Sequence, residues 1–200
     1  MWRPSTAEIK RRLVHASGSG MPLLYILGLV EWQVLGYLFI FSSVVVSVLE
    51  ALRLFGNLEW RIYDELTREY EQDNVAGYAL YMYSQTAVAL LFAPHVAIPG
   101  MLMLTIGDPI SGFLGSAPVG EMKSLPTLSA MFAVCLVLAA PFVVPVVGLV
   151  PGIVASAVGA VGATLADGAK PVVAGYVIDD NLSIPPVACV GIAAALWVVL

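Results

Sequence analysis

The sequence predicts an all-α protein, a polytopic transmembrane helical bundle of about seven spans with its N-terminus in the cytoplasm. Hydrophobic residues make up 60% of the 200-residue chain and charged residues only 12%, whereas soluble domains carry roughly 25% charged residues. Apolar runs close to the ~20 residues that cross a bilayer recur along the chain. Lysine and arginine collect between alternate runs, as in cytoplasmic loops. We therefore expect a single membrane domain over residues 1–200.

The predicted spans follow the apolar runs in order. They cover residues 13–30, 34–54, 75–92, 96–106, 125–144, 146–165 and 182–200. The fourth run is shorter than the ~20 residues of a full crossing. It either continues through residues 109–114 or is a broken helix that ends at a polar loop inside the protein.

Basic residues set the predicted orientation. Four of them precede the first span, so the positive-inside rule places residues 1–12 in the cytoplasm. The segments 55–74, 107–124 and 167–181 then also lie on the cytoplasmic side, and each contains lysine or arginine. The segment 55–74 has the apolar stripe of an amphipathic surface helix, and the other two are the candidate active-site loops.

Ionisable side chains at the ends of apolar helices are candidates for function, because they are costly at membrane depth. A first group enters the first span with Arg11, Arg12 and His15. His15 shares a helix face with Arg11, since the two are four residues apart. For the arginines, the structural alternative is a simple topology anchor.

A second group lies in the segment 107–124. Its members are Gly107, Asp108, Ser111, Gly115, Lys123 and Ser124. Glycine and proline here leave backbone amides free, while Asp108 is suited to hold a divalent ion against phosphate oxygens and Lys123 to neutralise charge. The segment is not a P-loop, because GxxxxGK[ST] is absent. A re-entrant turn with an Asx-type cap is the structural alternative.

A third group follows the sixth span with Asp167 and Lys170, and continues with Asp179, Asp180 and Asn181. Adjacent acids repel, so helix capping explains at most one of them. The Asp-Asp pair indicates a Mg²⁺ site that takes carboxylates together with substrate phosphates. The three groups favour phosphoryl or nucleotidyl transfer beside a lipid. A transporter is the alternative, although it is expected to bury its acids mid-span.

At these residues the sequence resembles the CTP-dependent lipid-alcohol kinases, the family of dolichol kinase, phytol kinase and yeast-type diacylglycerol kinase, which is related to the phosphatidate cytidylyltransferases. Residues 11–15 are similar to its Arg-Lys-x-x-His entry, with arginine where lysine is usual. Residues 107–115 resemble its Gly-Asp-x-x-Ala/Ser-x-x-x-Gly loop. Shorter likenesses are the Lys-Ser at 123–124, the Asp-Asn-Leu-x-x-Pro at 180–185, and Gly77 with Tyr81. The Glu-Gly that often follows Lys-Ser is missing, and Asp167 stands where glutamate is expected.

The resemblance implies transfer of the γ-phosphate of CTP to dolichol or a related polyprenol, of geranylgeraniol or phytol type, at the cytoplasmic face of the cell membrane. Mg²⁺ would be held by Asp108, Asp179 and Asp180, and His15 or Asp167 would accept the alcohol proton. The expected catalytic residues are Asp108, Lys123, His15 and Asp167. The expected phosphate-binding residues are Arg11, Arg12, Gly107, Ser111, Gly115, Ser124, Lys170 and Asn181.

Three further expectations accompany this resemblance. A cytidylyltransferase that makes a CDP-lipid is the nearest alternative activity on such a scaffold. The resemblance, combined with the net charge of -5, implies a salt-adapted archaeal source. Nucleic acid is not an expected partner.

Overall fold

A computed structural model describes residues 6–56, 67 and 71–199, and these residues are mainly helical, with one short hairpin as their only sheet. The predicted all-α class is thereby confirmed. The amphipathic segment expected over 55–74 falls largely outside the described residues. The elements are α1 (Thr6–Ser17), α2 (Gly20–Ile26), α3 (Trp32–Phe55), α5 (Gly77–Leu91), α6 (Pro94–Leu102), the π-helix η2 (Met103–Gly107), α7 (Asp108–Leu114), α8 (Leu125–Val147), α9 (Leu149–Gly168), β1 (Val172–Val173), β2 (Tyr176–Val177) and α10 (Asp180–Val199).

Five helical segments among the described residues are long and apolar enough to cross a membrane. They are Trp32–Phe55, Pro94–Leu114, Leu125–Val147, Leu149–Gly168 and Asp180–Val199. The membrane class predicted from composition is confirmed at this level. The number of seven spans and the cytoplasmic N-terminus stay predictions.

The first and third predicted spans form shorter helices than expected. The first is divided into α1 and α2, because the chain turns at Gly18 and Ser19. A Cβ atom at Gly18 would lie 1.8 Å from the hydroxyl oxygen of Tyr81, so this turn also brings α1 against α5. The third predicted span corresponds to α5, which is 15 residues long.

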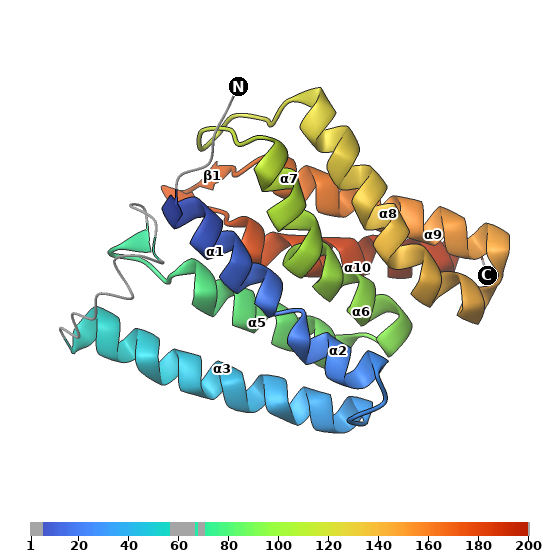
Figure 1. Cartoon of the computed structure of the whole chain (residues 1–200), viewed down its shortest axis with the longest axis horizontal. Helices are drawn as coiled ribbons and strands as arrows, with labels where there is room; N and C mark the ends of the chain where they lie inside the picture. The colour runs from blue at the N-terminus through green and yellow to red at the C-terminus, as the bar shows by residue number, and fades with distance from the viewer. Residues whose placement is uncertain (1–5, 57–66, 68–70, 200) are drawn as a thin grey trace.

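The fourth apolar run continues through residues 109–114, which is one of the two alternatives left open by the sequence. Helices α6 and α7 are joined end to end by η2, and together they form the most deeply buried of the five candidate spans. Figure 1 shows this segment in the middle of the bundle, with α3 along one edge. The predicted loop 107–124 therefore begins as a helix.

Helix α9 packs on both α8 and α10, and α8 and α10 each also pack on α6. Figure 1 shows α8 and α9 on one flank of the central segment. Small residues of α9 make this packing close, since a Cβ atom at Gly159 would lie 2.4 Å from a side-chain atom of Ile192 on α10. Helix α3 packs on α5 at the opposite flank. The end of the bundle where α9 ends at Gly168 and α10 begins at Asp180 is called the site end below.

Candidate functional site

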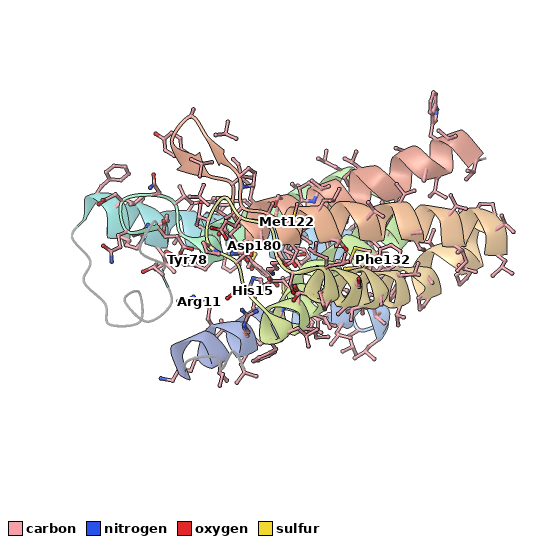
Figure 2. The ribbon with its side chains drawn as sticks, turned by 90° about the horizontal axis from the view of Figure 1, so that it is seen from above. Arg11, His15, Tyr78, Met122, Phe132 and Asp180 are labelled. Atoms are coloured by element: carbon pink, nitrogen blue, oxygen red, sulfur yellow. The ribbon has the colours of Figure 1, made fainter. Side chains whose placement is uncertain are left out.

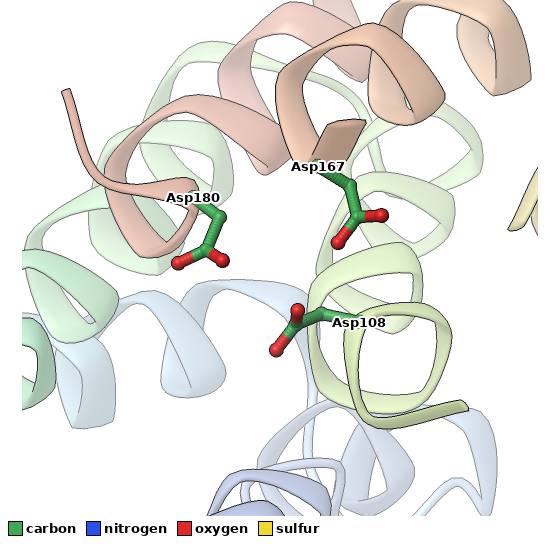
Figure 3. Close-up of side chains that lie close together, drawn as sticks. All are labelled: Asp108, Asp167 and Asp180. Carbon is green, nitrogen blue, oxygen red and sulfur yellow. The ribbon is translucent and has the colours of Figure 1, made fainter. Parts of the chain in front are cut away.

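Three buried carboxylates meet at the site end. They belong to Asp108 at the start of α7, Asp167 near the end of α9 and Asp180 at the start of α10 (Figure 3). One carboxylate oxygen of each lies within 4.8 Å of the other two. The residues are 9%, 1% and 2% exposed, and burying an uncompensated carboxylate is strongly unfavourable. This cluster of three aspartates therefore requires positive charge beside it.

The backbone immediately before Asp108 is the π-helix η2. A π-helical turn is rare, and it frequently occurs at functional sites because it changes the direction of the side chains that follow. Gly107, the last residue of η2, packs on α8. A Cβ atom there would lie 3.2 Å from Cε of Met131 and 3.3 Å from Sγ of Cys135. Because Gly107 has no side chain, the backbone next to Asp108 can pack closely against Met131 and Cys135 of α8.

Asp167 is held by Lys123 and Ser111. Nζ of Lys123 lies 2.7 Å from Oδ1 of Asp167 and donates to Oγ of Ser111 at 3.1 Å. Oγ of Ser111 in turn donates to Oδ2 of Asp167 at 2.6 Å. The backbone N–H of Lys123 donates to the carbonyl oxygen of Gly168 at 2.9 Å, which fixes the lysine beside α9. Three residues from two of the predicted sequence groups therefore share one network.

Lys170 neutralises Asp180, the third member of the cluster. Its Nζ atom lies 2.7 Å from Oδ2 of Asp180 and 3.9 Å from Oδ2 of Asp179. Oδ1 of Asp179 accepts hydrogen bonds from the backbone N–H of Asn181 at 3.0 Å and from its side-chain Nδ2 at 2.6 Å. The sequence placed Asp179 in the metal set, but in the carboxylate cluster Asp167 stands in its place. The physical reason is that Asp179 holds Asn181 at the start of α10.

His15 connects α1 to Asp108 and Asn181. Its Nδ1 atom lies 3.2 Å from Oδ2 of Asp108, and its Nε2 atom is hydrogen-bonded to Oδ1 of Asn181. Since Nδ2 of Asn181 donates to Asp179, Oδ1 is the acceptor and Nε2 of His15 the donor. Burial lowers the pKa of His15, but its contact with Asp108 and the charge of that carboxylate outweigh burial and raise the pKa above its ordinary value. A raised pKa favours the protonated form of His15, which would give Asp108 a cationic partner.

Arg12 packs against the start of α7. Its Nη1 atom lies 3.4 Å from the carbonyl oxygen of Asp108 and 3.5 Å from that of Pro109, and its guanidinium carbon is 5.4 Å from the centre of the Phe113 ring. Gly112 leaves the space for this contact, because a Cβ atom there would lie 1.3 Å from Nη1. Arg12 therefore ties α1 to α7 next to the cluster.

The remaining predicted residues lie around these networks. Arg11 is half-buried on α1 at the site end, as is visible in Figure 2. Gly115 and Ser124 both lie beside Thr127 of α8. Oγ of Ser124 is 2.9 Å from Oγ1 of Thr127, and a Cβ atom at Gly115 would lie 2.8 Å from the same oxygen. Gly115 and Ser124 thus shape the connection between α7 and α8.

A second polar network at the site end was missed by the sequence reasoning. The buried carboxylate of Glu50 accepts hydrogen bonds from Nε of Arg53 at 3.0 Å, from the backbone N–H of Ala76 at 2.8 Å and from the hydroxyl of Tyr78. Glu71, which is also buried, accepts the N–H at the start of α5 at 3.1 Å. This network fixes α5 to the end of α3. The signal that could have identified Glu50 is an acidic residue inside the predicted apolar span 34–54.

The donor chemistry of the aspartate cluster suits a hard divalent cation. Mg²⁺ prefers oxygen ligands at about 2.0–2.1 Å, so two opposed ligands are about 4.2 Å apart. Three ligands cannot all be opposed, and adjacent ligands in an octahedral shell are about 2.9 Å apart. The three oxygens lie within 4.8 Å of one another, so they would close around an ion by up to about 2 Å. In donor type, Asp108, Asp167 and Asp180 fit the binding of Mg²⁺.

The site as a whole combines buried carboxylates for a cation with lysine, arginine and histidine side chains suited to an anion. It lies where three candidate membrane spans begin or end. No known protein family, curated protein or solved structure matches the chain.

Proposed function

We propose that the protein is a CTP-dependent lipid-alcohol kinase that phosphorylates dolichol or a related polyprenol. The observation that carries this proposal is the buried cluster of Asp108, Asp167 and Asp180 with a cationic side chain beside each carboxylate. Phosphoryl transfer depends mainly on positioning and on neutralising charge. At the end of a membrane bundle, a water-soluble nucleotide can meet an alcohol whose apolar tail remains in the lipid.

The charge balance of the cluster supports this activity. His15, Lys123 and Lys170 each neutralise one of the three aspartates. A Mg²⁺ ion bound by the aspartates would supply charge stabilisation for the nucleotide phosphates. The ammonium groups of Lys123 and Lys170 would then contact phosphate oxygens, together with Arg11 and Arg12. The four basic residues come from α1 and from the segments that follow α7 and α9.

In the proposed transfer, the lipid hydroxyl oxygen forms a bond to the γ-phosphorus while the bond from that phosphorus to the β–γ bridging oxygen breaks, and CDP leaves. The hydroxyl proton passes to a base. Both ring nitrogens of His15 are engaged, one with Asn181 and one facing Asp108. Asp167 is engaged in the same way, by Ser111 and Lys123, so both expected bases, His15 and Asp167, remain candidates for this step.

A cytidylyltransferase is the second candidate, because the same cluster is suited to bind a nucleoside triphosphate. In that reaction a lipid phosphate oxygen attacks the α-phosphorus and pyrophosphate leaves. A transporter is less well supported, since Asp167 and Asp180 lie at the ends of their candidate spans and only Asp108 lies inside one.

The test uses purified protein in detergent with CTP labelled in its γ-phosphate, Mg²⁺ and a polyprenol. If the protein is a kinase, we expect the label in the lipid. If the label appears in pyrophosphate when a lipid phosphate is the acceptor, the protein is a cytidylyltransferase and the kinase proposal is rejected. Asp108→Asn should abolish the transfer. Asp73→Asn, which changes an exposed acid just before α5, should retain it. If neither acceptor yields a nucleotide-dependent product, both enzymatic proposals are rejected.

A further inference from the structure

The hairpin formed by β1 and β2 joins α9 to α10 at the site end. Figure 2 shows that it stands out from the side of the bundle. Ala174 and Gly175 form its tip with φ of 50° and 86°, the left-handed pair that a two-residue type I′ hairpin requires. The eight residues 171–178 contain no charged side chain. This composition is unusual for a connection that water would solvate.

The apolar side chains of the hairpin are exposed. Val172, Val173 and Tyr176 are 53%, 57% and 64% exposed, respectively. The segment between α7 and α8 at the same end exposes the carboxylate-bearing Glu121 next to Met122, which is 55% exposed. A compact exposed apolar element marks a contact surface.

The base of the hairpin is held firmly against the candidate site. Nζ of Lys170 lies 2.7 Å from Oδ2 of Asp180, and the carbonyl oxygen of Lys170 accepts the N–H of Gly120 at 3.1 Å. The N–H of Ile178 donates to the carbonyl oxygen of Pro171 at 2.9 Å and closes the ladder. The apolar tip thus projects from a charged and anchored base.

The exposed apolar surface continues from the hairpin onto the membrane-spanning helices. Leu165, three residues before the end of α9, is 57% exposed, and Leu182, two residues after the start of α10, is 38% exposed. Both belong to candidate membrane spans. The hairpin joins these two helix ends, so a bilayer that covers the two leucines would border the base of the hairpin.

We propose that the hairpin is an interfacial membrane anchor, with its apolar tip inserted into the headgroup layer of the bilayer that the protein spans. An arm of three residues reaches about 10 Å at ~3.3 Å per residue, which matches the roughly 5–10 Å depth of interfacial insertion. The unpaired outer edges of the two strands exclude the hydrocarbon core, where backbone groups must be satisfied. Tyr176 is the residue type that prefers this interface. The anchor would hold Lys170 and the aspartate cluster at headgroup level.

The proposal is tested by labelling Val173→Cys with an environment-sensitive fluorophore in protein reconstituted into phosphatidylcholine vesicles. The native Cys135 and Cys189 are fully buried, so the reagent is directed to the introduced thiol. We expect strong quenching by lipids with a nitroxide near the headgroup, weaker quenching by a nitroxide near the end of the acyl chain, and little quenching by aqueous iodide. A label at Glu121→Cys, at the same end of the bundle, should be quenched mainly by iodide.

Tyr176→Cys provides a second reporter, because Tyr176 pairs with Val173 across the ladder and its label should report the same depth. Quenching of both labels mainly by iodide would overturn the proposal. So would fluorescence that depends on the protein-to-lipid ratio, because it would assign the surface to a second copy of the chain. The measurement requires no nucleotide or alcohol substrate, so its outcome is independent of the proposed kinase activity.

Discussion

Replacing Lys123 by methionine should destabilise the protein by about 3 kcal/mol, because it leaves the carboxylate of Asp167 buried without its counter-charge. The two side chains are 8% and 0% exposed, and Nζ lies 2.7 Å from Oδ1. Removing one partner of a buried ion pair costs about 3–5 kcal/mol. The lower end applies here, since Ser111 still donates to Asp167 and a hydrogen bond to a charged group contributes about 1.5–3 kcal/mol. The measurement is the free energy of unfolding from denaturant titration in detergent micelles at neutral pH, followed by helical circular dichroism.

Two further variants separate lost charge compensation from lost packing. The double variant Lys123→Met with Asp167→Asn should recover much of the stability, because no uncompensated charge remains. Lys10→Met changes an exposed lysine on α1 and should alter the unfolding free energy by less than about 1 kcal/mol. A loss below about 1 kcal/mol for Lys123→Met would refute the argument, as would a double variant less stable than the single one.

Three other predictions concern the surroundings of the site. Gly112→Ala should cost about 1–3 kcal/mol in unfolding free energy, because its Cβ would lie 1.3 Å from the guanidinium that packs on α7. Gly20→Ala should change it by no more than ~1 kcal/mol, since a Cβ there meets no described atom within 4 Å, and an equal loss for both variants would contradict the steric reasoning. Glu50→Gln should cost about 2–4 kcal/mol by removing the counter-charge of Arg53, whose side chain is 9% exposed, while γ-phosphate transfer per folded molecule stays unchanged. Mg²⁺ at ten times its dissociation constant should stabilise the protein by about 1.4 kcal/mol in thermal unfolding but not the Asp108→Asn variant, and equal stabilisation of both would exclude the aspartate cluster as the ion site.

Much of the fold was predictable because each part of the prediction depends on local composition. Long uncharged runs identify helices that can cross a bilayer, and five such helices are found among the described residues. The lengths of the first and third predicted spans were less predictable. The turn at Gly18 is coupled to the close approach of Tyr81, and the sequence around Gly18 does not predict that contact.

For the candidate site, too, the local patterns were predictable from the sequence and the spatial contacts were not. Sequence groups far apart in the chain were expected to share one face, and Lys123, Asp167 and Ser111 do share one network. The sequence could not predict which of two neighbouring acids joins the aspartate cluster. Asp179 and Asp180 are adjacent, yet only Asp180 joins the cluster, because the other carboxylate is taken up by Asn181.

Composition and charge pattern alone established that the chain is an apolar helical bundle and that its ionisable residues gather at helix ends. These properties follow from hydrophobicity and from the cost of placing charge in lipid, which act on each segment separately. The tertiary structure decided which three carboxylates meet, which cation compensates each of them, and that an uncharged hairpin projects beside them. Such pairings depend on how helices from distant parts of the chain pack together, and packing is a property of the whole bundle.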